Sequence, residues 1–155
     1  MRSLGRVTRG KFRIILLAIF LLAAAFAGWS WLRPYAWDAD PKARCKVVGV
    51  LVKRDHSNFW LDAHMKILPD QTHDLLQPVR LKTASGRELE PADTTLAGDK
   101  NRPTTDLWFK FWLERSDLEG PLTLHINHGT LLIKADSEIP NLGSAESKYF
   151  TTQHW

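Results

Sequence analysis

Two patterns of hydrophobic and polar positions divide the chain. From Ile14 to Leu32, 19 residues follow one another without a charged side chain. An α-helix of that length spans about 28 Å, close to the ~30 Å hydrocarbon core of a bilayer. Beyond residue 42 the hydrophobic positions recur with the period of two that is typical of β-strands. The sequence therefore predicts a transmembrane helix followed by a domain of strands.

Seven or eight short strands are expected between residues 43 and 155. Two of them share the letters FWL, at Asn58–Leu68 and Asp106–Arg115. The others are expected at Lys46–Arg54, Pro78–Thr83, Arg87–Glu90, Leu122–Ile126, Thr130–Lys134 and Lys148–Gln153. Short strands with no helix among them favour two packed sheets, so the predicted fold is an antiparallel, immunoglobulin-like β-sandwich.

Glycine and proline mark the connections between these strands. The pair His128–Gly129 predicts a two-residue hairpin turn, with Gly129 supplying the positive φ that such a turn needs. Ser85–Gly86 predicts a second hairpin. The polar stretch from Pro91 to Thr105 is expected to be the longest loop.

Positive charge is concentrated at the start of the chain. Residues 1–33 carry a net charge of +6 and the remaining residues a net charge of −2. The domain therefore lacks the basic surface of a nucleic-acid-binding protein. Positive residues keep their end of a membrane helix in the cytoplasm. We expect a cytoplasmic tail (1–13), a transmembrane helix (14–32), a linker (33–42) and an exported domain (43–155) that is periplasmic or extracellular.

The end of the hydrophobic segment has two interpretations. Ala25-Phe26-Ala27 before Gly28 resembles a signal-peptidase site, and cleavage after Ala27 would release a soluble ligand-binding domain. The alternative is an uncleaved anchor with an aromatic belt at the membrane interface. That belt would consist of Trp29, Trp31, Tyr35 and Trp37. The anchor is favoured, because it accounts for the density of aromatic rings.

Alternation places the tryptophans of the FWL strands away from the core. Phenylalanine and leucine share one face, which sends Trp60 and Trp112 to the other face together with Trp108. The polar residues expected beside these rings are Asp62, His64, Lys66 and Lys110. Aromatic rings among polar groups are typical of surfaces that bind a protein or glycan partner. In the alternative, a terminal segment such as the C-terminal stretch YFTTQHW covers the rings, or a bulge turns one of them inward.

Catalysis and metal binding have less support in the sequence. A weak metal-binding or hydrolytic site could combine His64, His125 and His128 with Asp62, but a metal needs three or four suitable ligands, and no third ligand lies near the pair His125 and His128. No nucleophile elbow, zinc-protease or phosphate-loop motif is present. The single cysteine, Cys45, is expected to be a small buried hydrophobic residue.

These observations predict a non-enzymatic protein without a cofactor. It is expected to cross the bilayer once through Ile14–Leu32, with its N-terminus inside the cytoplasm. The β-sandwich would act as an envelope accessory domain on the outer side of the cytoplasmic membrane.

Overall fold

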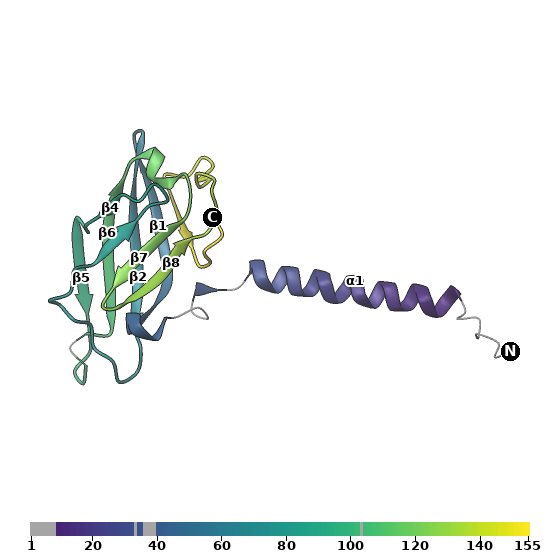
Figure 1. Cartoon of the computed structure of the whole chain (residues 1–155). Coiled ribbons are helices and arrows are strands. Elements are labelled where there is room, and N and C mark those ends of the chain that lie inside the picture. Colours follow the sequence, from purple (N-terminus) through teal and green to yellow (C-terminus); the bar gives the residue numbers. More distant parts are fainter. Residues whose placement is uncertain (1–8, 33, 36–39, 103) are drawn as a thin grey trace. The chain divides into compact units, whose positions relative to one another are not determined.

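The computed structural model describes residues 9–32, 34–35, 40–102 and 104–155. The chain divides into two compact units, one up to Arg33 and one from Pro34 to Trp155. The first unit contains the helix α1 (Arg9–Trp31), and the second contains the strands (Figure 1). The second unit begins within the stretch that was expected to be a linker.

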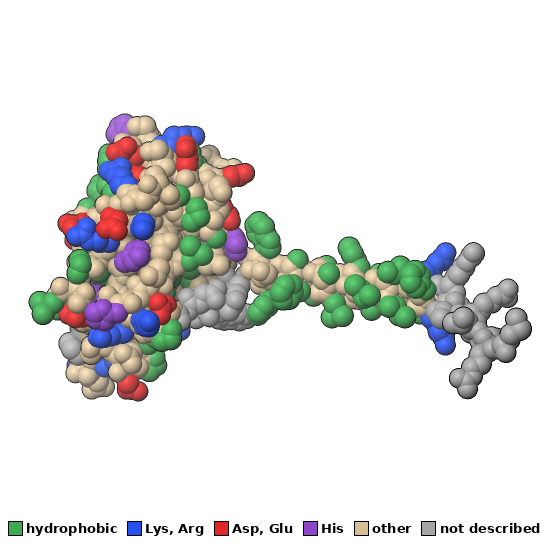
Figure 2. Space-filling model, viewed as in Figure 1, with side chains coloured by type: hydrophobic (Ala, Val, Ile, Leu, Met, Phe, Trp, Pro, Cys, Tyr) green, Lys and Arg blue, Asp and Glu red, His purple; other side chains and the backbone are tan. Residues whose placement is uncertain are grey.

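The helix α1 includes nearly all of the predicted membrane segment. Its part from Gly10 to Trp31 is long enough and apolar enough to cross a membrane, judged by length and composition alone. Figure 2 shows hydrophobic side chains along α1, with basic side chains gathered at the end nearer the N-terminus. Leu22, for example, is 71% exposed. Exposed hydrophobic side chains along a helix of this length are expected of a segment that lies in lipid.

In the described residues, nine strands form two antiparallel sheets. The five-stranded sheet has the order β5 (Asp93–Ala97), β6 (Asp106–Leu113), β2 (Asn58–Ile67), β1 (Cys45–Asp55) and β9 (Ser147–Phe150). The four-stranded sheet has the order β4 (Glu88–Leu89), β3 (Arg80–Lys82), β7 (Leu122–Ile126) and β8 (Gly129–Lys134). Two short 3₁₀ helices, η2 (Pro41–Ala43) and η3 (Arg115–Leu118), accompany them. The prediction of an all-β sandwich is confirmed.

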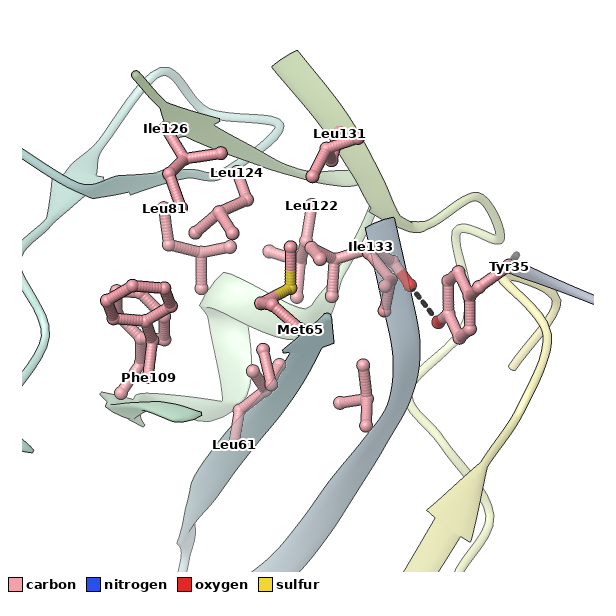
Figure 3. Packing of buried hydrophobic residues seen from close by; sticks show 14 of the residues in the cluster. Tyr35, Leu61, Met65, Leu81, Phe109, Leu122, Leu124, Ile126, Leu131 and Ile133 are labelled. Atoms are coloured by element: carbon pink, nitrogen blue, oxygen red, sulfur yellow. Dashed lines mark hydrogen bonds between the residues drawn. The ribbon is translucent and has the colours of Figure 1, made fainter. Parts of the chain in front are cut away.

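Alternate residues of both sheets form one hydrophobic core (Figure 3). From the five-stranded sheet, β2 and β6 contribute Phe59, Leu61, Ala63, Met65, Ile67, Leu107, Phe109, Phe111 and Leu113. From the four-stranded sheet, the core receives Leu81, Leu122, Leu124, Ile126, Leu131 and Ile133. The period of two in the sequence therefore reflects which side chains of each strand point into the core.

Strand β1 contains an irregularity that changes which of its residues face inward. Its pairing with β2 shifts register between Val47 and Gly49. Because one extra residue reverses the alternation, Val47 and Val50 are both buried although they are three positions apart. Leu51 is consequently 38% exposed on the outer face of the sheet. Cys45 is buried at the start of this strand, and burial raises the pKa of its thiol to about 12.

The turn between β7 and β8 differs from the prediction in one detail. The positive φ belongs to Asn127 (52°), whereas Gly129 is already the first residue of β8 and pairs with Ile126. Asparagine tolerates this left-handed conformation better than most residues. Gly129 is required for a different reason. A Cβ atom there would lie 2.1 Å from the backbone nitrogen of Ala43.

The stretch predicted as the longest loop contains a strand. Residues Asp93–Ala97 form β5, which pairs with β6 at the edge of the five-stranded sheet. The prediction of a continuous loop from Pro91 to Thr105 is therefore wrong. All five residues of β5 are exposed, so the strand has no alternation of buried and exposed side chains that a sequence pattern could reveal.

The beginning of the second unit is fastened to its last residues. The backbone nitrogen of Tyr35 donates to Thr151 O at 3.1 Å, and its hydroxyl donates to Ile133 O (Figure 3). Trp155 Nε1 donates to the Tyr35 hydroxyl oxygen at 2.7 Å, and the Trp155 ring stacks on Phe150. Tyr35 is 4% exposed. These contacts, which we call the clasp, close one side of the sandwich.

Candidate functional site

Pairing of β2 with β6 brings the three tryptophans of the FWL strands onto one sheet face. Trp60 lies directly opposite Trp112, and His64 lies directly opposite Trp108. Their neighbours along each strand, such as Leu61 and Phe111, point into the core. This register makes the two FWL strands neighbours in one sheet and places their indoles on its outer side. We call this surface of β2 and β6 the tryptophan face.

Polar neighbours fix the position of two of the three rings. Trp60 Nε1 donates to Asp55 Oδ2 at 3.0 Å. The Trp108 ring stacks on the His64 imidazole with centroids 4.4 Å apart and planes 6° apart. His64 Nε2 in turn lies 2.9 Å from Asp106 Oδ1. The rings therefore occupy defined positions before any partner binds, which reduces the entropy lost on binding.

Trp112 is the most exposed of the three indoles. Its side chain is 38% exposed, whereas Trp60 and Trp108 are partly buried. It borders a hollow of about 510 Å³ that also reaches η3. Besides Trp112, the hollow is lined by Ser57, Asn58, Glu114, Arg115, Ser116 and Glu119. An exposed indole beside polar groups is the arrangement that anchors many protein and glycan interfaces.

The C-terminal stretch does not cover the tryptophan face. Its first residues, Tyr149 and Phe150, belong to β9 at the far edge of the sheet, beyond β1. Its last residue, Trp155, packs in the clasp against Phe150 and Tyr35. The alternative in which this stretch shields the indoles is therefore wrong.

Asp62 occupies the middle of a cross-strand row on the same face. Lys110 lies opposite it on β6, and Leu51 lies opposite it on β1. Asp93 on β5 continues the row beyond Lys110. Burial raises the pKa of the Asp62 carboxyl, although Lys110 and His64 act in the opposite direction. The carboxylate thus sits in a partly dehydrated position between the Trp60–Trp112 pair and the His64–Trp108 pair.

A smaller hollow opens beside this carboxylate. It measures about 190 Å³ and is lined by Leu51, Lys53, Trp60, Asp62 and Lys110. The Lys110 ammonium lies 5.5 Å from the centroid of the Trp60 ring, at the distance of a cation–π contact. Strands β1, β2 and β6 all contribute to the hollow, so it depends on the register of the central sheet.

The histidines considered for a metal site are not brought together. His64 lies on β2 of the five-stranded sheet, whereas His125 lies on β7 and His128 in the turn that follows it. His64 pairs with Asp106 and not with Asp62. Within the part of the chain that the structure describes, no group of three or more His, Cys, Asp or Glu side chains is placed to hold a metal ion.

The residues proposed for a membrane belt lie in different surroundings. Trp29 and Trp31 are exposed on α1. Tyr35 is instead buried in the clasp, because its ring completes the core and its hydroxyl has two partners there. Its expected place at a membrane interface is therefore corrected. Trp37 lies outside the described residues.

Sequence reasoning did not identify four residues that shape the tryptophan face. Asp55 and Asp106 hold Trp60 and His64, and Leu51 and Lys53 complete the smaller hollow. No local sequence pattern marks Asp55 or Asp106, because the turn between β1 and β2 and the pairing of β2 with β6 bring them to their partners. Leu51 and Lys53 depend on the irregularity in β1, which reverses the face on which they lie.

Comparisons with known proteins add no further information. No protein-family model, curated protein or solved structure matches this chain.

Proposed function

We propose that this protein is a membrane-tethered, non-enzymatic β-sandwich that binds a protein or glycan partner on the outer side of the cytoplasmic membrane. One observation carries the proposal: Trp60, Trp108 and Trp112 are gathered by strand register on an outer sheet face. Indoles are expensive to leave in water and are enriched where partners bind. As an envelope accessory domain, the sandwich would present these rings to its partner.

Tethering is supported by α1. The helix continues through Ala27 and Gly28 to Trp31, so the small residues of the possible cleavage site lie within it. Basic residues precede the hydrophobic segment, which favours a cytoplasmic N-terminus and a periplasmic or extracellular domain. The alternative is a soluble ligand-binding domain released after Ala27. The mass of the mature protein separates the two, because cleavage leaves an N-terminus at Gly28.

An immunoglobulin-like topology is part of the proposal. In immunoglobulin domains one sheet has the strand order A-B-E-D, and the other contains C, F and G with C′ beside C in the variable type. The orders β1-β2-β6-β5 and β4-β3-β7-β8 correspond to these when the strands are lettered along the chain. Strand β9 then adds to the edge of the first sheet, beside β1. This correspondence supports a domain class that serves widely as a binding module.

The binding proposal is tested by photo-cross-linking in native membranes. A photoreactive phenylalanine analogue replaces Trp112, and in a matched control it replaces Leu132, which is also 38% exposed but lies on β8 of the other sheet. We expect a discrete cross-linked species from position 112 and none from position 132. Equal yields from both positions, or none from either, would count against the tryptophan face.

Single substitutions then distinguish binding from structural roles. Trp60→Ala or Trp108→Ala, each combined with the cross-linker at position 112, should reduce the cross-linking yield severalfold. Near-UV circular dichroism should show that each variant remains folded at the temperature of the cross-linking experiment. Loss of cross-linking that occurs only together with unfolding would indicate that the indoles have a structural role.

The topology is tested by labelling cysteines. Cys45 is a suitable background, because burial raises the pKa of its thiol to about 12 and keeps it unreactive. Thr94→Cys on the exposed strand β5 should react with a membrane-impermeant maleimide while the cytoplasmic membrane is intact. Ser3→Cys in the basic tail should react only after lysis. The reverse pattern would exclude the proposed orientation.

A further inference from the structure

The smaller hollow of the tryptophan face combines four kinds of chemical group within one compact space. Trp60 and Leu51 supply apolar walls, Asp62 supplies a carboxylate, and Lys53 and Lys110 supply ammonium groups. These side chains come from the three central strands β1, β2 and β6, which are paired along most of their lengths. The walls of the hollow are therefore fixed by the sheet and not by a loop.

Asp62 contributes an acceptor that the protein itself does not use. Its Oδ1 atom is buried and has no hydrogen-bond donor among the described residues. Buried polar atoms nearly always have a partner, because an unpaired one costs free energy. Because Asp62 lines the hollow while Oδ1 itself has no exposed surface, a donor group of a bound ligand would reach the carboxylate at its other oxygen, Oδ2. The ligand should therefore carry at least one hydroxyl or N–H group.

The charges around the hollow narrow the class of ligand further. A cationic group would be repelled by the ammonium groups of Lys53 and Lys110, and an anionic group that pairs with these ammonium groups would also lie beside the carboxylate of Asp62. A neutral group with hydroxyls can pair with both kinds of charged side chain, because a hydroxyl donates to a carboxylate and accepts from an ammonium. Apolar C–H surface on the same group would pack against Trp60 and Leu51.

The volume limits the ligand to about one ring. The hollow measures about 190 Å³, roughly six times the ~30 Å³ that one water molecule occupies in the liquid. Pockets for drug-sized ligands start at roughly 300 Å³. A single sugar ring with several hydroxyls is of suitable size and chemistry, and longer glycans would continue over the neighbouring indoles.

We infer that this hollow is a subsite for one neutral sugar ring of a glycan, with Asp62 accepting a hydroxyl hydrogen and Lys53 and Lys110 donating to other oxygens. This inference rests on the proposed function of the tryptophan face, and it names the glycan as the class of partner. A peptide side chain in the same hollow is an alternative that the experiment separates.

The test measures sugar binding to the full chain in nanodiscs by calorimetry. The probes are the trimer of N-acetylglucosamine and maltotriose, both neutral, and trigalacturonate as an anionic counterpart. We expect at least one neutral trimer to bind and trigalacturonate to bind more weakly. Asp62→Asn should weaken the binding of that trimer at least tenfold, because it replaces a charged acceptor with a neutral amide.

The matched control is Asp93→Asn, which makes the same change of charge in the same cross-strand row but outside the hollow. It should alter the dissociation constant by less than about twofold, as expected for an exposed charge screened by solvent. Lys53→Gln provides a second variant at an exposed position, where folding is not at risk. We expect it to weaken binding at least threefold.

The other outcomes of these binding and cross-linking experiments distinguish failure of the sugar subsite from failure of the proposed function. If no neutral trimer binds but cross-linking through position 112 to a protein persists, the sugar subsite is refuted and the proposed function stands. If neither occurs, both are refuted. A trimer that binds equally well to the parent chain and to Asp62→Asn, or tighter binding of trigalacturonate, would also overturn the assignment of this hollow.

Discussion

The two faces of the β2–β6 pair carry aromatic residues in opposite environments. On the inner face, Phe109 and Phe111 are fully buried in the hydrophobic core between the two sheets. On the outer face, Trp60 and Trp108 are only partly buried and contact polar groups, namely Asp55 and His64. The inner rings stabilise the fold through burial, whereas the outer rings are positioned by directed contacts. One strand pair thus presents a buried aromatic face and a partly exposed one through the alternation of its side chains.

The largest contrast is expected between two residues that are adjacent in sequence. Phe111→Ala should lower the free energy of unfolding by about 3–5 kcal/mol, because it leaves a cavity in a closed core. Trp112→Ala should lower it by less than about 1.5 kcal/mol, since much of that side chain already contacts water. Thermal melts of the full chain, followed by near-UV circular dichroism, measure both. Similar losses for the two variants would show that the outer indole is also part of the core.

A second contrast uses two glycines. Gly129→Ala should cost about 1–3 kcal/mol, because its Cβ would meet the backbone of Ala43, which cannot move without disturbing η2. Gly49→Ala should cost much less, although its Cβ would lie 2.2 Å from the Tyr149 hydroxyl. Tyr149 is half-exposed and its side chain can rotate away. The same melts test this pair, and an equal cost would mean that Tyr149 is held as firmly as a backbone segment.

The smallest effect is expected from Asp62→Asn and depends on pH. Burial raises the pKa of Asp62 in the folded chain above the ordinary 3.8, so ionisation of this carboxyl opposes folding. At pH 7 the asparagine variant should therefore melt at a higher temperature than the parent chain. The difference should shrink as the pH falls through the raised pKa and vanish below about 3.8. A difference that grows in acid would contradict the direction of the shift.

The strands that face the core could be predicted, and the edge strand could not. In β2 and β6 every second residue is buried. The alternation of hydrophobic and polar residues therefore predicts both the strand and the face that points into the core. Strand β5 has no buried residue and pairs with β6 at the edge of the sheet. Sequence periodicity arises from the alternation of buried and exposed side chains. It therefore cannot reveal a strand in which every residue is exposed.

The candidate site was predictable as a group of rings and not as a hollow. The alternation of the FWL strands alone predicts that Trp60, Trp108 and Trp112 share one face. The hollow requires Leu51 and Lys53 from β1, and their orientation follows from the irregularity between Val47 and Gly49. A single extra residue in a strand changes the face of everything after it, and the sequence does not mark its position.

The clasp also determines where mechanical load enters the sandwich. For a chain anchored as proposed, a pull on a partner held at the tryptophan face is resisted through the chain that arrives at Pro34. The first contacts to bear that tension are the pairing of Pro34 and Tyr35 with Thr152 and Thr151 and the hydrogen bonds of the Tyr35 hydroxyl. These contacts lie before β1 in the sequence, so they would yield before the strands that carry the indoles. The tryptophan face would thus keep its shape under forces that already open the clasp.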